Sequence, residues 1–330
     1  MTSPRALCTG CSTQMAPTLL SCPSCGRLVH ANRLTELAAA ASMAEKTGDF
    51  GGALAAWREA AMLLPNGSRQ RLAAEEKIRV LSEQVGSGSL PGAQPWWKKV
   101  SSLGPVGVGL ALLGKAKFLL LGFSKLGTLL SFFVSLSVYW SLWGWQFALG
   151  FLLSIYVHEM GHVYALSQYG IAASAPMFIP GFGALVRLKQ NPANAVEDAR
   201  VGLAGPVWGL GACLAALAIY ALTGNTLFAA IASAGAMLNL FNLIPVWQLD
   251  GSRGIRSLTA PQVWILALLA AGMFWLVRDG LLILIAVLLA YRAWTKREEA
   301  TPDWTGMIQF AGLIIALSLF SLVPLPHAIK

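Results

Sequence analysis

Apolar residues run in long stretches from residue 127 to the end of the chain, and short polar segments separate them. No Asp, Glu, Lys or Arg occurs from Leu126 to Val157 or from Val201 to Leu249. A helix needs about 20 apolar residues to cross a bilayer. The pattern therefore predicts a mainly α-helical polytopic membrane protein with about six transmembrane helices. The spans are expected at residues 127–143, 145–169, 201–249 (two crossings that turn at Gly224-Asn225), 257–277, 280–291 (a tilted span or a re-entrant piece) and 304–324.

Composition supports the membrane assignment, because 56% of the residues are hydrophobic and only 12% are charged, against about 25% charged in a soluble protein. The net charge is +9, and basic residues beside apolar spans favour membrane topology over nucleic-acid binding. No signal peptide is visible at residues 1–20. We therefore expect a multi-pass protein of the cytoplasmic membrane with a cytosolic amino-terminal domain. The loops then follow the positive-inside rule, because the outward loops hold only Arg278, with Lys330 on the tail.

Four of the five cysteines form two C-x-x-C pairs near the start of the chain. The pairs are Cys8 with Cys11 and Cys22 with Cys25. Each pair presents two thiolates from one tight turn, which suits tetrahedral zinc, and a cytosolic compartment keeps thiols reduced. We expect a zinc ribbon over residues 1–30 with one structural zinc ion. A redox dithiol or a chance pairing is the alternative.

Residues 31–85 are expected to form a helical region. Its first part resembles one tetratricopeptide-like helix pair, and a third helix follows at residues 68–85. A generic helical hairpin fits equally well, and either form could bind a protein partner. The residues that carry the resemblance are Ala39, Ala40, Gly48, Asp49, Phe50, Ala53, Leu54, Trp57, Ala60, Leu63 and Pro65.

A membrane domain is expected over residues 100–330. Residues 86–99 are expected to be a flexible linker that ends in an aromatic and basic interfacial anchor. Residues 104–127 combine an apolar run with three lysines, which favours helices lying in the membrane interface rather than a full span.

The sequence His158-Glu159-Met160-Gly161-His162 places three ionisable side chains inside an apolar span. Such residues cost about 2.5–3.5 kcal/mol each at bilayer depth, so they usually persist for function. On a helix, residues i and i+4 share one face, so His158 and His162 can bind one zinc ion. Glu159 lies beside that ion, where it can act as a general base toward water.

A catalytic zinc needs a third protein ligand and one open position. Asp250 is the first charged residue after the apolar stretch that begins at Val201, and it follows the helix breaker Pro245 and precedes the turn-permitting Gly251. In the expected topology, Asp250 and His158 lie toward the same side of the membrane. Asp250 is therefore the best candidate for the third ligand.

The ordered motifs of this segment resemble those of the site-2 protease family of intramembrane zinc metalloproteases. The resemblance covers residues 127–256, the catalytic core, and rests on His158-Glu159-x-x-His162, Ala204-Gly205-Pro206, Asn242-Leu243-x-Pro245 and Leu249-Asp250-Gly251. Two positions depart from many members, which have Asn shortly after Gly-Pro and Asp-Gly-Gly at the end. This chain has Val207-Trp208-Gly209 and Asp250-Gly251-Ser252 there.

The resemblance implies that His158, His162 and Asp250 ligate one catalytic Zn²⁺ and that Glu159 is the catalytic carboxylate. It also implies a transmembrane protein substrate, cut in or near its helix within the lipid bilayer by regulated intramembrane proteolysis. Residues 176–188 would form a membrane-associated β hairpin whose edge could hold unwound substrate; an apolar loop packed on the core is equally compatible.

Two asparagines lie on one helical face near the expected zinc. Asn242, by family analogy, and Asn239 are candidates for holding the substrate backbone, and satisfied interhelical hydrogen bonds are the alternative, above all for Asn239. Gly202, Gly205, Gly209 and Gly211 are expected to permit close helix approach.

Two functions other than proteolysis can be compared with the sequence. A catalytically silent membrane scaffold could act through the zinc ribbon and helical repeat. A transporter or channel would need ionisable residues on further spans, and the stretch from Val201 to Leu249 offers none.

Overall fold

The computed structural model describes residues 6–16, 18–87, 126–181, 183–186, 188, 190–296 and 301–323. The chain divides into two compact units, Met1–Leu90 with Ser167–Ala172, and Pro91–Leu166 with Ala173–Lys330. The expected interfacial anchor and nearly all of the interfacial helices of residues 104–127 lie outside the described residues.

The first unit begins with a short antiparallel ribbon, in which β1 (Ala6–Leu7) pairs with β2 (Gln14–Met15). Three helices follow, as the sequence predicts, whereas the likeness to a tetratricopeptide repeat stays a prediction. The third helix extends to Ser87, into the segment that was expected to be linker. The helices are α1 (Ala31–Thr47), α2 (Phe50–Met62) and α3 (Arg69–Ser87).

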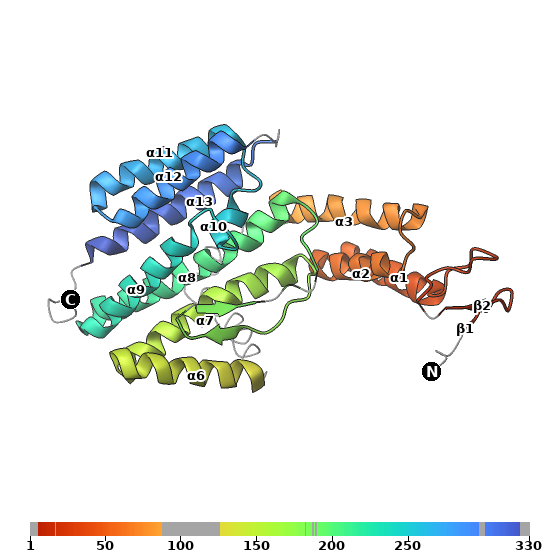
Figure 1. Cartoon of the computed structure of the whole chain (residues 1–330), viewed down its shortest axis with the longest axis horizontal. Coiled ribbons are helices and arrows are strands. Elements are labelled where there is room, and N and C mark those ends of the chain that lie inside the picture. Colours follow the sequence, from red (N-terminus) through yellow and green to blue (C-terminus); the bar gives the residue numbers. More distant parts are fainter. Residues whose placement is uncertain are drawn as a thin grey trace. The chain divides into compact units, whose positions relative to one another are not determined.

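The second unit is a bundle of apolar helices with one β hairpin (Figure 1). Several of its helices begin at a side chain that accepts a backbone N–H, among them Asn194, Asn225 and Asp303, because the first N–H groups of a helix lack intrahelical partners. Its elements are α6 (Leu126–Trp143), α7 (Trp145–Gln168), β3 (Met177–Ile179), β4 (Gly183–Leu185), α8 (Ala195–Thr223), α9 (Thr226–Asn242), α10 (Asp250–Gly254), α11 (Ala260–Val277), α12 (Gly280–Thr295), α13 (Trp304–Ser318) and a 3₁₀ turn, Leu319–Leu322.

Four of the described helices are long and apolar enough to cross a membrane: Leu126–Trp143, Ala195–Thr223, Ala260–Val277 and Trp304–Leu322. Two further apolar helices, α9 and α12, are shorter. The mainly helical, multi-pass membrane architecture is therefore confirmed, whereas the expected number of about six spans stays a prediction. Helix α12 is continuous to Thr295, beyond the expected end at Tyr291.

Two apolar clusters hold the second unit together. The larger one joins α8, α9, α11, α12 and α13, which lie side by side in Figure 1, and Phe310 is fully buried within it. The smaller one joins α6, α7 and the hairpin, where the Phe132 and Phe178 rings meet edge to face at 5.2 Å. The backbone N–H of Gly181 donates to the Tyr139 hydroxyl at 3.0 Å. The expected hairpin thus forms, anchored on α6.

Candidate metal centre

Helix α7 presents both histidines of the H-E-x-x-H sequence on one face. The Nε2 atoms of His158 and His162 lie 3.2 Å apart, as the i, i+4 spacing predicts. Both imidazoles are buried. Glu159 is also buried, and its carboxylate lies close enough to His158 and Asp250 to interact electrostatically with both.

Asp250 reaches the two imidazoles because the chain folds back sharply after α9. The helix ends at Asn242, and α10 begins at Asp250. A side chain at Gly251 would place its Cβ 1.9 Å from the carbonyl oxygen of Leu243, so this turn accepts only glycine. The Ser252 hydroxyl closes the turn by donating to the Leu249 carbonyl at 2.8 Å. Gly251 and Ser252 therefore shape the turn that brings the Asp250 carboxylate to the two imidazoles.

The three side chains form a compact donor set. The Asp250 Oδ2 lies 3.1 Å from His158 Nε2, and its Oδ1 lies 3.2 Å from His162 Nε2. Zinc holds nitrogen at about 2.0–2.1 Å in tetrahedral sites, which corresponds to ligand separations of about 3.3–3.4 Å. Two imidazoles and one carboxylate at these separations fit zinc, and three protein ligands are typical of a site that keeps one position open.

The outer nitrogens of both imidazoles are held by acceptors on neighbouring helices. His162 Nδ1 lies 2.8 Å from the Val201 carbonyl oxygen on α8. His158 Nδ1 lies 2.8 Å from Asn239 Oδ1 on α9, and the Asn239 amide donates to the Gly235 carbonyl. Since each acceptor takes a proton from Nδ1, both Nε2 atoms keep their lone pairs for a metal.

The two asparagines occupy different sides of the His158 imidazole. Asn239 is fully buried and contacts Nδ1, the nitrogen remote from Asp250. Asn242 Nδ2 lies 3.5 Å from Nε2, the nitrogen on the side of the donor set. The hydrogen bonds of Asn239 agree with the interhelical alternative that the sequence offered above all for that residue. The Val201 carbonyl could not be predicted, because a backbone acceptor has no sequence signature.

Helix α8 passes directly against the donor set at Gly205. A Cβ there would lie 2.2 Å from His162 Nε2 and 2.7 Å from His158 Nε2. Gly202 and Gly209 also make close approaches, to Arg253 and Asn239 respectively, as expected, but the expectation for Gly211 is wrong, because its Cβ would enter open space. The helical period turns Gly211 away from the face that Gly202, Gly205 and Gly209 share.

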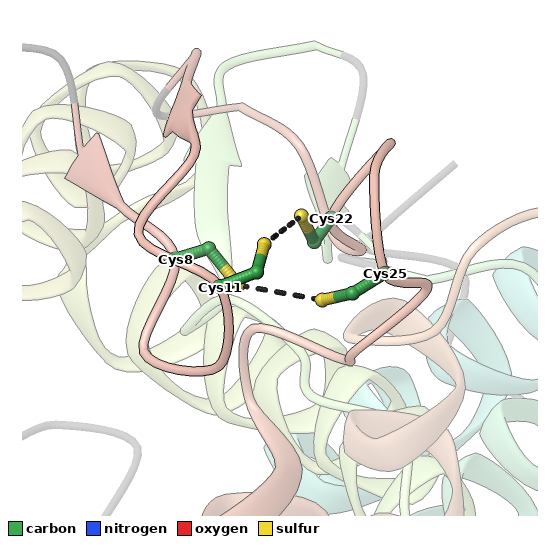
Figure 2. A group of neighbouring side chains, drawn as sticks. All are labelled: Cys8, Cys11, Cys22 and Cys25. Atoms are coloured by element: carbon green, nitrogen blue, oxygen red, sulfur yellow. Dashed lines mark hydrogen bonds between the residues drawn. The ribbon is translucent and has the colours of Figure 1, made fainter.

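The four amino-terminal cysteines lie together in the first unit (Figure 2). The Sγ atoms of Cys8 and Cys25 are 3.7 Å apart, and those of Cys11 and Cys22 are 3.5 Å apart. A tetrahedral zinc with Zn–S bonds of about 2.3 Å corresponds to S···S separations of about 3.8 Å. All four are free thiols. Hydrogen bonding with the side chain and backbone of Thr13 lowers the pKa of Cys11 to about 6, which favours the thiolate form at this cysteine.

Part of the chain is similar to known zinc metalloproteases. Residues 146–233, which include His158 and His162 but not Asp250, match peptidase family M50. Zinc metalloprotease MJ0392 of Methanocaldococcus jannaschii is 28% identical over 127 residues, which is 37% of this chain and 35% of that protein. Putative zinc metalloprotease Rip3 of Mycobacterium tuberculosis is 30% identical over 208 residues, 54% of this chain and 51% of that protein. The chain thus spans about half or less of the length of these relatives, and no solved structure matches it.

Proposed function

We propose that the chain is an intramembrane endopeptidase of the site-2 type of zinc metalloprotease, because residues 146–233 match peptidase family M50 and two zinc metalloproteases are similar to it over 127 and 208 residues. It hydrolyses peptide bonds in or near transmembrane helices of other membrane proteins, as a step of regulated intramembrane proteolysis. The observation that carries this proposal is the meeting of His158, His162 and Asp250 from α7 and α10 in a buried donor set. The proposed location is the cytoplasmic membrane, with the amino-terminal domain in the cytosol.

The donor set and Glu159 divide the chemistry between them. Zinc, when held by His158, His162 and Asp250, supplies Lewis-acid chemistry that polarises a carbonyl and makes water a stronger acid. The Glu159 carboxylate takes a proton from the attacking water and passes it to the nitrogen of the leaving amine. The Asn242 amide is proposed to donate a hydrogen bond to the substrate, since its Nδ2 lies on the Nε2 side of His158.

A cavity along α7 and α9 supports an apolar substrate. It has a volume of about 810 Å³ and is lined almost wholly by apolar side chains, including Phe147 and Phe151 of α7 and Met237 and Phe241 of α9. The same two helices carry His158 and Asn242. None of the proposed zinc ligands lines the cavity, but Phe241, which does, directly precedes Asn242. We propose that a transmembrane segment enters through this cavity and reaches the donor set along α9.

The hairpin is a second proposed contact for the substrate. A peptide bond inside a helix is shielded by its own hydrogen bonds, so the segment must unwind before it is cut. An unwound segment could pair with the edge of the β3–β4 hairpin by strand addition.

The amino-terminal Cys8, Cys11, Cys22 and Cys25 are proposed to hold a structural zinc ion in a domain that binds a protein partner.

The substitution Glu159→Gln tests the proposed function. Full-length protein in lipid nanodiscs is mixed with a fluorescently labelled transmembrane peptide, and cleavage and bound zinc are both measured. The variant should keep its zinc and lose cleavage by at least about 100-fold, the lower end of general acid–base contributions. A variant as active as wild type would refute the role of Glu159.

Deletion of residues 1–90 separates the protease from the scaffold alternative. Membrane proteomes of cells with wild-type, Glu159→Gln and truncated protein are compared for uncleaved membrane proteins. Accumulation in the Glu159→Gln cells supports proteolysis. If the truncation abolishes every cellular effect while Glu159→Gln abolishes none, the scaffold function is correct instead.

A further inference from the structure

The short helix that carries Asp250 is tied to α8 by an ion cluster around the buried Asp198. Asp198, in the first turns of α8, accepts from Arg253 Nε at 2.8 Å through Oδ1 and from Arg256 Nη1 through Oδ2. Arg253 belongs to α10, and Arg256 is the second residue after the end of that helix. We call Asp198, Arg253 and Arg256 the α10 clamp.

The two ion pairs of the α10 clamp are also hydrogen bonds with defined geometry. The Asp198 side chain is only 6% exposed, and each of its oxygens accepts from a different arginine. Charge-assisted hydrogen bonds at buried carboxylates are shorter and stronger than neutral ones. An exposed ion pair contributes almost nothing to position, and the Arg256 side chain is 58% exposed. The pair of Asp198 with Arg253, whose side chain is 17% exposed, is therefore the contact that can fix α10.

The clamp lies one helical turn from the contacts that hold the rest of the donor set. Along α8, the Val201 carbonyl holds His162. At the next residue, Gly202, an added Cβ would lie 2.7 Å from the Arg253 Cβ and 3.1 Å from the Asp250 carbonyl oxygen. The backbone of α10 therefore rests directly on α8, and one stretch of α8 sets the position of both a histidine and the aspartate.

We propose that Asp198 is a positioning residue, which through Arg253 fixes the Asp250 carboxylate at bonding distance from the two imidazoles. A helix of five residues has too few internal hydrogen bonds to hold its own orientation. Without the clamp, α10 can tilt about the Gly251 turn, and the carboxylate moves away from a site that tolerates only about 0.5 Å of displacement. The inference rests on the proposed zinc site, and it goes beyond it by assigning a residue outside the ligand set.

The test compares two buried carboxylates of similar exposure. Asp198→Asn removes the charge that holds α10. Asp303→Asn removes the partner of Arg200, whose Nη2 lies 2.6 Å from Asp303 Oδ1. The Asp303 side chain is 9% exposed, and its contacts with Arg200, Ser257 and the Gly306 N–H all lie outside α10. Every protein is full length and carries Cys8→Ser and Cys11→Ser, so that bound zinc reports only the second unit.

Zinc affinity is measured by competition with a chromogenic chelator, and thermal unfolding is recorded for each variant. Asp198→Asn should weaken zinc binding by about 10- to 100-fold, the usual effect of losing a group that orients a metal ligand, and Asp303→Asn should leave it unchanged. Arg253→Gln should weaken it similarly, and adding it to Asp198→Asn should cause little further loss, since the two residues act as one pair.

The outcomes separate this inference from the proposed function. Equal zinc affinity in all variants, equal losses from Asp198→Asn and Asp303→Asn, or fully additive losses with Arg253→Gln would each overturn the inference while leaving the zinc site intact. A parent protein that binds no zinc in its second unit would refute both. If Asp198→Asn does not fold, the comparison of Arg253→Gln with Asp303→Asn decides the question by the same criteria.

Discussion

The substitution Asn239→Leu should weaken zinc binding although it leaves all three proposed zinc ligands in place. Asn239 Oδ1 accepts from His158 Nδ1 at 2.8 Å, and the side chain is fully buried. Leucine has nearly the same shape but no acceptor, and water has no access to replace it. The variant therefore leaves the His158 Nδ1 proton without a partner and releases the constraint on the ring.

The size of the effect follows from two considerations that agree. Leaving one buried donor unsatisfied costs about 1–3 kcal/mol. Losing a hydrogen-bond partner of a metal-bound histidine typically costs about 10- to 100-fold in metal affinity, which is about 1.4–2.7 kcal/mol. We expect a loss of zinc affinity within this range, because the imidazole can then rotate or place its proton on Nε2.

The assay is chelator competition on full-length protein that lacks the amino-terminal metal site. Asn239→Asp is the control that restores an acceptor, and it should bind zinc nearly as well as the parent. Asn242→Leu is the matched control on the other side of the imidazole: it should keep the zinc and lower kcat. Equal zinc affinity in Asn239→Leu and the parent would refute the orienting role of Asn239. A loss of zinc from Asn242→Leu as large as that from Asn239→Leu would refute the distinction between the two asparagines.

Three further substitutions test other parts of the structure. Gly205→Ala should abolish zinc binding to the second unit, because its Cβ would lie 2.2 Å from His162 Nε2; Gly211→Ala, which enters open space, should have no effect, and a zinc-loaded Gly205→Ala protein would contradict the geometry. Ala234→Phe should narrow the cavity lined in part by Ala234 and raise KM for a transmembrane peptide with zinc content unchanged; an unaltered KM would exclude this cavity as the substrate path. Cys22→Ser should remove the metal of the first unit, measured by zinc content, and leave zinc bound to the second; retention of two zinc ions would contradict the Cys₄ site.

Much of the membrane architecture could be predicted because each membrane span requires a local pattern in the sequence. A span must be a continuous apolar segment of helix, so the boundaries of α6 and α11 and the end of α8 follow within a few residues from apolar runs and their polar ends. Helix α8 begins at Ala195, before the expected start at Val201. The turn-forming Pro180-Gly181 and Gly183 between apolar residues were equally compatible with a β hairpin, which the family resemblance implied, and with an apolar loop. The number of spans is harder to predict, because α9 and α12 are apolar but short.

Part of the candidate site follows from spacing along one helix, and the rest depends on contacts between helices that are distant in the sequence. The i, i+4 geometry of a helix brings His158 and His162 together without any tertiary contact, and the motif order named Asp250 as their partner. The sequence favoured Asn242 over Asn239 for a role at the substrate but did not predict that Asn239 holds His158, and it gave Asp198 no role. Their difference depends on which helix passes each side chain, which local spacing does not encode.

The sequence by itself determined where the membrane helices lie, which residues share a helical face, and which ionisable groups stand inside an apolar environment. Each of these follows from the period of one helix and from the high cost of burying charge. Only the tertiary structure decided that Asn239 contacts the outer nitrogen of His158 and that the Val201 carbonyl contacts that of His162. It also decided that Asp198 accepts a hydrogen bond from Arg253, on the helix of Asp250. Those contacts arise where α7, α8, α9 and α10 cross, and crossing positions are set by side-chain packing over the whole bundle.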